Sequence, residues 1–125
     1  MNEDLRLWAV RGATKSRSNN PETIVEATEE LLRELITRNG LSVDRIVSCI
    51  FTSTHDLNAE FPAVAARKLG LDRVPLLCAQ EIDVPGAMPS VIRALVHYHA
   101  PADHTPTHTY LGEAQELRSD LKAAQ

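Results

Sequence analysis

Two arginines stand in parts of the sequence that otherwise resemble buried strands. Arg11 directly follows an apolar run, and Arg93 lies inside the apolar segment 91–96. A buried guanidinium needs an anionic partner, because an isolated charge in apolar surroundings is strongly unfavourable. Two interpretations stay open. Each arginine forms an internal salt bridge with an acidic side chain, or each binds a carboxylate of a ligand through its planar array of N–H donors.

Further candidate residues follow the predicted strand 74–79. Glu81 and Asp83 are two residues apart, so their carboxylates could share a face and act as an acid and a base. Polar residues are common at strand ends, so this spacing alone is weak evidence. Cys78 lies three residues before Glu81, but no histidine is close in sequence to activate it as a nucleophile. A packing or backbone-contact role is therefore favoured for Cys78.

Four histidines near the C-terminal end lack the spacing of a closed zinc site, and two prolines separate them. The five glycines of the chain are isolated, without the spacing of a phosphate-binding or dinucleotide-binding loop. The sequence therefore predicts neither a metal nor another cofactor. The histidines concerned are His97, His99, His104 and His108.

Length and composition limit the possibilities further. The chain has 125 residues, of which 43% are hydrophobic and 24% charged, and this predicts one globular domain over residues 1–125. The net charge of −4 argues against a surface that binds nucleic acid or an anionic membrane. No apolar run is long enough to cross a bilayer, and residues 1–4 lack the apolar segment of a secretory signal. Two cysteines without a disulfide framework predict a reducing, cytoplasmic location.

The elements that must position these residues can be predicted from periodicity and capping signals. Their order indicates an α/β (α+β) fold in which helices cover one face of a mixed β-sheet. Gly12 is expected to end the first strand, Asn20 to cap the first helix, and residues 113–125 to form a loosely packed tail. The segment 91–99 is ambiguous, but as a strand it places Arg93 on one face with Leu95 and His97. The predicted strands are 5–10, 46–53, 74–79, 91–99 and 108–111, and the predicted helices are 21–38 and 62–69.

Five short motifs, in this order along nearly the whole chain, resemble the monofunctional AroH-class chorismate mutases. They are Val10-Arg11-Gly12-Ala13-Thr14, Phe61-Pro62-Ala63 with Arg67, Cys78-Ala79-Gln80-Glu81-Ile82-Asp83-Val84-Pro85-Gly86, Ile92-Arg93, and Tyr110-Leu111 followed by Leu117-Arg118. The resemblance implies a homotrimer of pseudo-α/β-barrel type with active sites between neighbouring chains. It also implies an isomerase that converts chorismate to prephenate by a Claisen rearrangement, in the biosynthesis of phenylalanine and tyrosine. That reaction is intramolecular and needs no nucleophile, metal or redox cofactor.

The same resemblance assigns a catalytic role to four residues. Arg93 would lie at the ether oxygen of the substrate and also touch the side-chain carboxylate. Arg11 and Tyr110 would hold that carboxylate. Glu81 would bind the ring hydroxyl, assisted by the backbone around Cys78, which includes Ala79 and Gln80.

The resemblance also assigns residues that surround the substrate. Arg67 and Arg118 would flank the mouth of the pocket near the ring carboxylate. Two positions depart from the family pattern, because Val64 stands where some relatives have lysine and Leu77 where threonine can occur. The expected pocket walls are Phe61, Ala63, Val64, Leu77 and Leu117.

Two other functions are compatible with such a chain. One is a small-metabolite-binding or regulatory module without catalytic activity on the same trimeric fold, since a fold does not determine a function. The other is a trimeric deaminase of enamines or imines with a similar subunit. The joint presence of Arg11, Glu81, Arg93 and Tyr110 favours the mutase. A binding module needs no cation at an ether oxygen, and a deaminase needs a positioned water.

Overall fold

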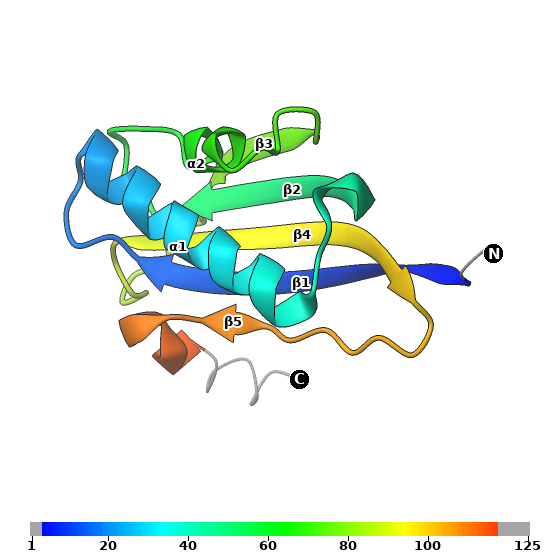
Figure 1. Cartoon of the computed structure of the whole chain (residues 1–125). Helices are drawn as coiled ribbons and strands as arrows, with labels where there is room; N and C mark the ends of the chain where they lie inside the picture. Colours follow the sequence, from blue (N-terminus) through cyan, green and yellow to red (C-terminus); the bar gives the residue numbers. More distant parts are fainter. Residues whose placement is uncertain (1–3, 118–125) are drawn as a thin grey trace.

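Five strands form one mixed sheet in the computed structural model, which describes residues 4–117 (Figure 1). The strand order is β3-β2-β4-β1-β5, with β4 antiparallel to both β1 and β2, and with β2–β3 and β1–β5 parallel. The predicted mixed sheet is therefore confirmed. The strands are β1 (Leu5–Lys15), β2 (Ile46–Ser53), β3 (Leu76–Gln80), β4 (Val91–Pro101) and β5 (Thr109–Tyr110).

The first strand does not end at Gly12, as the sequence suggested. β1 continues to Lys15 because it pairs with β4 along its whole length, from Leu5 opposite Pro101 to Lys15 opposite Val91. Glycine is instead required at position 12 because α1 and β5 pack closely against β1 there. A Cβ atom at this position would lie 2.5 Å from the carbonyl oxygen of Thr109 and 2.9 Å from Cδ1 of Leu31.

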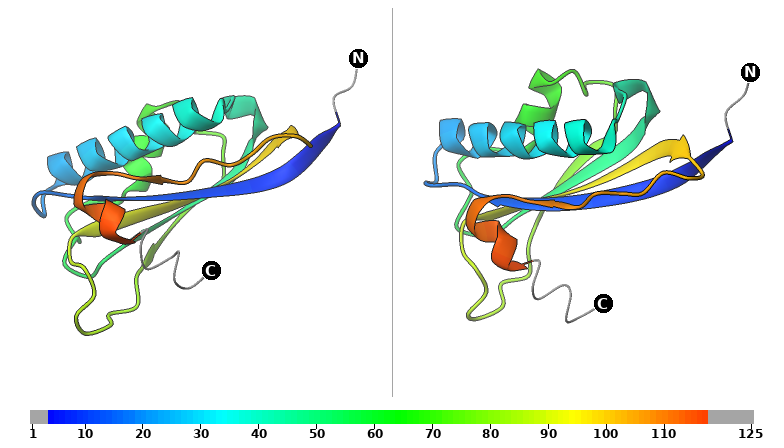
Figure 2. Two further views of the ribbon diagram at one scale, coloured as in Figure 1. Left: turned by 90° about the horizontal axis from the view of Figure 1, so that it is seen from below. Right: turned by 60° about the horizontal axis from the view of Figure 1, so that its bottom comes forward.

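Two helices, α1 (Pro21–Asn39) and α2 (Ala63–Lys68), cover one face of the sheet, as predicted (Figure 2). The Asn20 side chain accepts a hydrogen bond of 2.9 Å from the backbone N–H of Thr23, which caps α1 at its start. Gly40 ends α1 in the left-handed conformation, at φ 59°. A short 3-10 helix, Val43–Arg45, leads into β2. No helix within residues 4–117 has the length and apolar character to span a bilayer.

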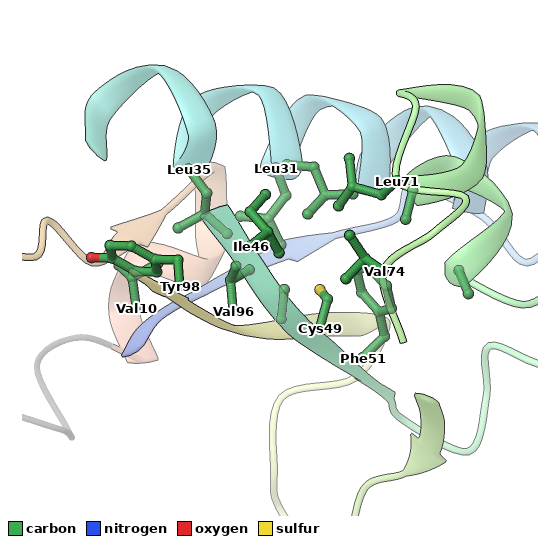
Figure 3. Close-up of a cluster of buried hydrophobic side chains, with 14 of the residues drawn as sticks. Val10, Leu31, Leu35, Ile46, Cys49, Phe51, Leu71, Val74, Val96 and Tyr98 are labelled. Atoms are coloured by element: carbon green, nitrogen blue, oxygen red, sulfur yellow. The ribbon is translucent and has the colours of Figure 1, made fainter. Parts of the chain in front are cut away.

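The main core lies between α1 and the sheet (Figure 3). Leu31 and Leu35 of α1 and Val10 and Val96 of the sheet are all buried. Burial alternates along β4 because successive side chains point to opposite faces, so Arg93, Leu95 and His97 share the face away from the helices. We call this the open face. The connection 81–90, drawn in yellow-green, extends on the same side (Figure 2).

The C-terminal part of the described chain is partly packed. A 3-10 turn covers Gly112–Ala114, and Ala114 is fully buried in a small cluster with Ala13, Val91 and Tyr110. Leu117 packs against the same cluster. The tail expected over residues 113–125 therefore contains a packed beginning, and its remainder lies outside the described residues.

Candidate active site

A cavity of about 310 Å³ opens on the open face of the sheet, and four strands and the residue after β3 contribute to it. Ion-pairing and hydroxyl side chains lie in it beside apolar walls. The lining residues are Arg11, Gly12, Ile50, Thr52, Glu81, Arg93, Ala94, Leu95 and Tyr110. The structure thus brings together, in one chain, all four residues that were assigned a catalytic role. We call this cavity the Arg93 pocket.

Strand register explains why these side chains meet. Ala13 of β1 lies opposite Arg93 of β4 and beside Tyr110 of β5. Arg11 is two residues before Ala13, so it points to the same face of β1. On the other side of β4, Thr52 of β2 lies opposite Arg93. The pocket therefore lies across the three central strands and the edge strand β5.

Glu81 enters the pocket from the end of β3. Its backbone N–H donates a hydrogen bond of 2.9 Å to the carbonyl oxygen of Ser53, which continues the β2–β3 pairing by one residue. Its Oε1 atom lies 3.4 Å from Nε of Arg93, and its Oε2 atom accepts a hydrogen bond from the Thr52 hydroxyl. The Glu81 side chain is 26% exposed and that of Arg93 is 37% exposed. This ion pair therefore remains accessible to a ligand.

The two arginines of the pocket are incompletely satisfied. The Nε atoms of both Arg11 and Arg93 are buried, and neither has a hydrogen-bond partner within residues 4–117. Buried polar groups are normally hydrogen-bonded, because an unmade bond to a charged donor is costly. The salt-bridge interpretation therefore explains Arg93 only in part. Two guanidinium groups with unused buried donors in one cavity are suited to a ligand that carries carboxylates.

Comparisons with known proteins agree with this chemistry. Residues 7–121 match the family described as chorismate mutase type I. The chain belongs to this family. Two relatives are named chorismate mutase AroH. The protein from Thermus thermophilus is 46% identical over 119 residues, covering 93% of this chain and 97% of that protein. The protein from Bacillus subtilis is 37% identical over 120 residues, covering 94% of each.

A solved structure extends the similarity to the fold. A chorismate mutase from Clostridium thermocellum superposes with a TM-score of 0.82 at 44% identity, covering 87% of this chain and 98% of that chain. The expected fold class and the expected family are both confirmed.

Several residues that the family resemblance placed around the substrate lie in a second cavity. This cavity has a volume of about 370 Å³ and lies beside the start of α2. Phe61, Cys78, Ala79 and Gln80 line it, and Phe61 is 66% exposed. Its lining and that of the Arg93 pocket share no residue. In a single chain, Phe61 therefore lines a different cavity from the catalytic four, whereas Gln80 directly precedes Glu81.

The remaining expected pocket residues are scattered in one chain. Ala63 is buried in the main core, and Val64 is half-buried in a groove between α1 and α2. Arg67 is exposed on α2, and Leu77 is exposed on β3, where its register with Ile50 places it on the open face. Leu117 packs near Tyr110, and Arg118 lies outside the described residues.

Other groups considered from the sequence have different environments. Asp83 does not pair with Glu81, because its carboxylate lies 3.2 Å from Nδ1 of His55. Cys78 packs against the main core, as expected for a structural cysteine. Burial raises the pKa of the Cys49 thiol to about 12, so this thiol is neutral at physiological pH. Within residues 4–117 no group of three or more histidine, cysteine or acidic side chains could hold a metal ion.

The histidines make separate contacts. Nε2 of His104 lies 2.7 Å from the Tyr98 hydroxyl, and Nδ1 of His97 lies 3.2 Å from the Ser48 hydroxyl. Nδ1 of His108 accepts a hydrogen bond of 3.2 Å from the backbone N–H of Arg11. These contacts are structural, and the four side chains do not converge on one point.

Sequence reasoning missed Thr52. It lies in the Arg93 pocket and contacts Glu81 directly. Residues 46–53 indicate a strand, and the alternation within it could have placed Thr52 on one of two faces. The local pattern contains no signal for which acidic residue Thr52 would meet, because that depends on the pairing of β2 with β3 and β4.

Proposed function

We propose that this chain converts chorismate to prephenate in the Arg93 pocket, as a step towards phenylalanine and tyrosine. The observation that carries the proposal is the pair of buried Nε atoms of Arg11 and Arg93, neither of which is hydrogen-bonded within residues 4–117, in a cavity that also contains Glu81 and Tyr110. Chorismate carries two carboxylates, an ether oxygen and a ring hydroxyl, so its polar groups match the donors and the acceptor of this cavity.

The reaction determines what the residues must do. The enolpyruvyl side chain must fold over the ring, and the ether oxygen gains negative charge as its C–O bond lengthens. Fixing the folded conformation removes an entropic part of the barrier. A cation at the ether oxygen stabilises the charge that develops in the transition state, and this requires neither a covalent intermediate nor a cofactor.

In the proposed arrangement, Arg93 provides that cation and also contacts the side-chain carboxylate. Arg11 and the Tyr110 hydroxyl hold the same carboxylate from β1 and β5. Glu81 accepts a hydrogen bond from the ring hydroxyl with the help of backbone groups near Cys78. All four side chains line one cavity, which supports a joint role.

We further propose that the active site is completed by a neighbouring chain in a homotrimer. The open face carries exposed apolar side chains, including Leu7 and Leu77, each 61% exposed. Exposed apolar residues on an uncovered sheet face are typical of a subunit interface. The second cavity supports the same proposal, because Phe61 would wall a substrate only if another copy brought it to the Arg93 pocket. Arg67 and Arg118 are assigned to the mouth of this combined site.

A cytoplasmic location is part of the proposal. Cys49 is a buried free thiol and Cys78 is a partly buried free thiol. Free thiols without a disulfide framework are typical of reducing compartments.

The test is direct: purified protein is mixed with chorismate, and chorismate loss and prephenate formation are followed by chromatography. Turnover that is lost in the Arg93→Ala variant supports the proposal. Binding of chorismate without conversion would instead identify a metabolite-binding module on this fold.

A further inference from the structure

We propose that Thr52 is a positioning residue that holds Glu81 in place and prevents it from closing onto Arg93. The proposal rests on the function assigned above to the Arg93 pocket. It adds a residue of β2 to the four residues of β1, β4, β5 and the end of β3 that were given a catalytic role above.

Thr52 is placed between the two charged residues by the sheet itself. It lies opposite Arg93 on β4 and opposite Ala79 on β3, two residues before Glu81. Its hydroxyl donates to Oε2 of Glu81. The other carboxylate oxygen, Oε1, faces Nε of Arg93 at 3.4 Å, and this contact does not satisfy the geometry of a hydrogen bond.

This arrangement matters because a free carboxylate and a free guanidinium form a bidentate pair. Two parallel N–H···O bonds are the preferred geometry of arginine with carboxylates. In such a pair, two of the five donors of Arg93 would be occupied by Glu81, and both oxygens of Glu81 would be used. By holding Oε2 towards β2, the Thr52 hydroxyl orients the carboxylate so that a single long contact with Arg93 remains, and this keeps Arg93 available to a substrate.

Threonine suits this task better than a longer polar residue. Its branched Cβ restricts the side chain to few rotamers, and its hydroxyl therefore has a defined direction. The side chain is half-buried in the pocket lining. Serine would keep the hydroxyl, and valine would keep the shape while removing the donor.

The experiment is a double-mutant cycle measured as kcat/KM for chorismate. We expect Thr52→Val to lower kcat/KM by about 10- to 100-fold, the effect of losing a hydrogen bond to a charged group. In the Glu81→Gln background the same change should lower it by less than about threefold, because the residue through which Thr52 acts has lost its charge. Thr52→Ser should retain activity within about threefold of the wild type.

Two controls separate positioning from a general effect on the fold. Ser48→Ala removes another hydroxyl from the open face of β2, distant from Glu81, and should leave kcat/KM unchanged. Tm should be the same for Thr52→Val and Thr52→Ser. A crystal structure of Thr52→Val should show Glu81 and Arg93 joined by two hydrogen bonds.

The outcomes are distinct. Additive effects of Thr52→Val and Glu81→Gln, or a Thr52→Ser variant as impaired as Thr52→Val, would overturn the positioning role. An unchanged Glu81–Arg93 contact in the Thr52→Val structure would also overturn it. If Arg93→Ala and Glu81→Gln themselves leave turnover intact, the function assigned to the pocket fails. If both strongly lower turnover and Thr52→Val leaves it unchanged, only the role of Thr52 fails.

Discussion

Nε of Arg93 lies 3.4 Å from Oε1 of Glu81, but it makes no hydrogen bond with any residue of the described chain. The two residues are therefore charge partners without being a closed pair. A salt bridge that served only stability would be expected to bring both groups into full hydrogen-bond geometry. The open contact is instead consistent with a guanidinium that completes its bonding with a substrate.

The first prediction concerns Arg93→Ala. If the cation acts mainly in the transition state, this change should lower kcat by at least about 10². Arg93→Lys should also be poor, because an ammonium group cannot contact the ether oxygen and a carboxylate with one planar array of donors. Both are measured by steady-state turnover of chorismate.

Stability distinguishes this role from a structural one. Glu81 is partly exposed and keeps its Thr52 partner in Arg93→Ala, so Tm should change little. A purely structural salt bridge would instead predict a destabilisation of about 3–5 kcal/mol. A folded Arg93→Ala protein with near-normal turnover would end the catalytic assignment.

The second prediction compares Glu81 with the histidines. Glu81→Gln keeps an acceptor for the ring hydroxyl and removes the charge, so turnover should fall. Single changes of His97, His99, His104 or His108 should have little effect, because none of them lines the Arg93 pocket. Loss of activity in a histidine variant, with Glu81→Gln unharmed, would indicate a different chemistry.

The third prediction concerns assembly. An active site built from the Arg93 pocket of one chain and Phe61 of another requires more than one copy. Sedimentation at several protein concentrations should give the mass of a trimer. Full activity in a strictly monomeric protein would contradict the proposal of a shared site.

Much of this fold could be predicted because its signals are local. Asn20, Pro21 and Gly40 are capping residues, and the structure places them at the two ends of α1. The alternation over 91–99 also correctly placed Arg93 and Leu95 on one face of a strand. The family resemblance depended on five motifs occurring together in one order, which no rule about a single segment would predict.

The rest depended on contacts between distant segments. Gly12 was expected to end a strand because glycine often does. Instead, β1 stays paired with β4 beyond Gly12, and the close approach of α1 and β5 explains why a residue without a side chain stands there. Thr52 was missed because its partner is determined by strand register. Likewise, neither the motif that begins at Phe61 nor the motif Ile92-Arg93 indicates that Phe61 and Arg93 lie in different cavities of one chain.

The fourth prediction follows from the packing of Gly12. Gly12→Ala would bring a methyl group 2.5 Å from the backbone oxygen of Thr109, and this oxygen cannot move without disturbing β5. We expect a loss of about 1–3 kcal/mol in the free energy of unfolding, the usual effect of overpacking. Denaturant unfolding measures it. Ala9→Gly, at an exposed position of the same strand, serves as the control for a general effect of strand propensity. An unchanged stability would show that β5 is not held close to β1.

The last prediction concerns Asp56, which holds the residues that lead into β4. Its Oδ2 atom accepts hydrogen bonds of 2.9 Å from both the backbone N–H and the hydroxyl of Ser90. Ser90 has a left-handed backbone, at φ 60°, and it lies three residues before Arg93. Hydrogen bonds from Thr54, and then from Ser90, lower the pKa of Asp56, and burial acts in the opposite direction.

A lowered pKa gives the sign of the pH dependence. The stabilisation by Asp56 is fully present above the pKa of an unfolded aspartate, about 3.9, and is lost as pH falls through the lower folded pKa. Wild type should therefore be more stable than Asp56→Asn at neutral pH, and this difference should shrink below about pH 4. Denaturant unfolding at fixed protein concentration measures it, with the exposed Asp103→Asn as a control for the loss of one charge. A difference that stays constant down to about pH 2.5 would show that the Asp56 charge does not hold Ser90 in place.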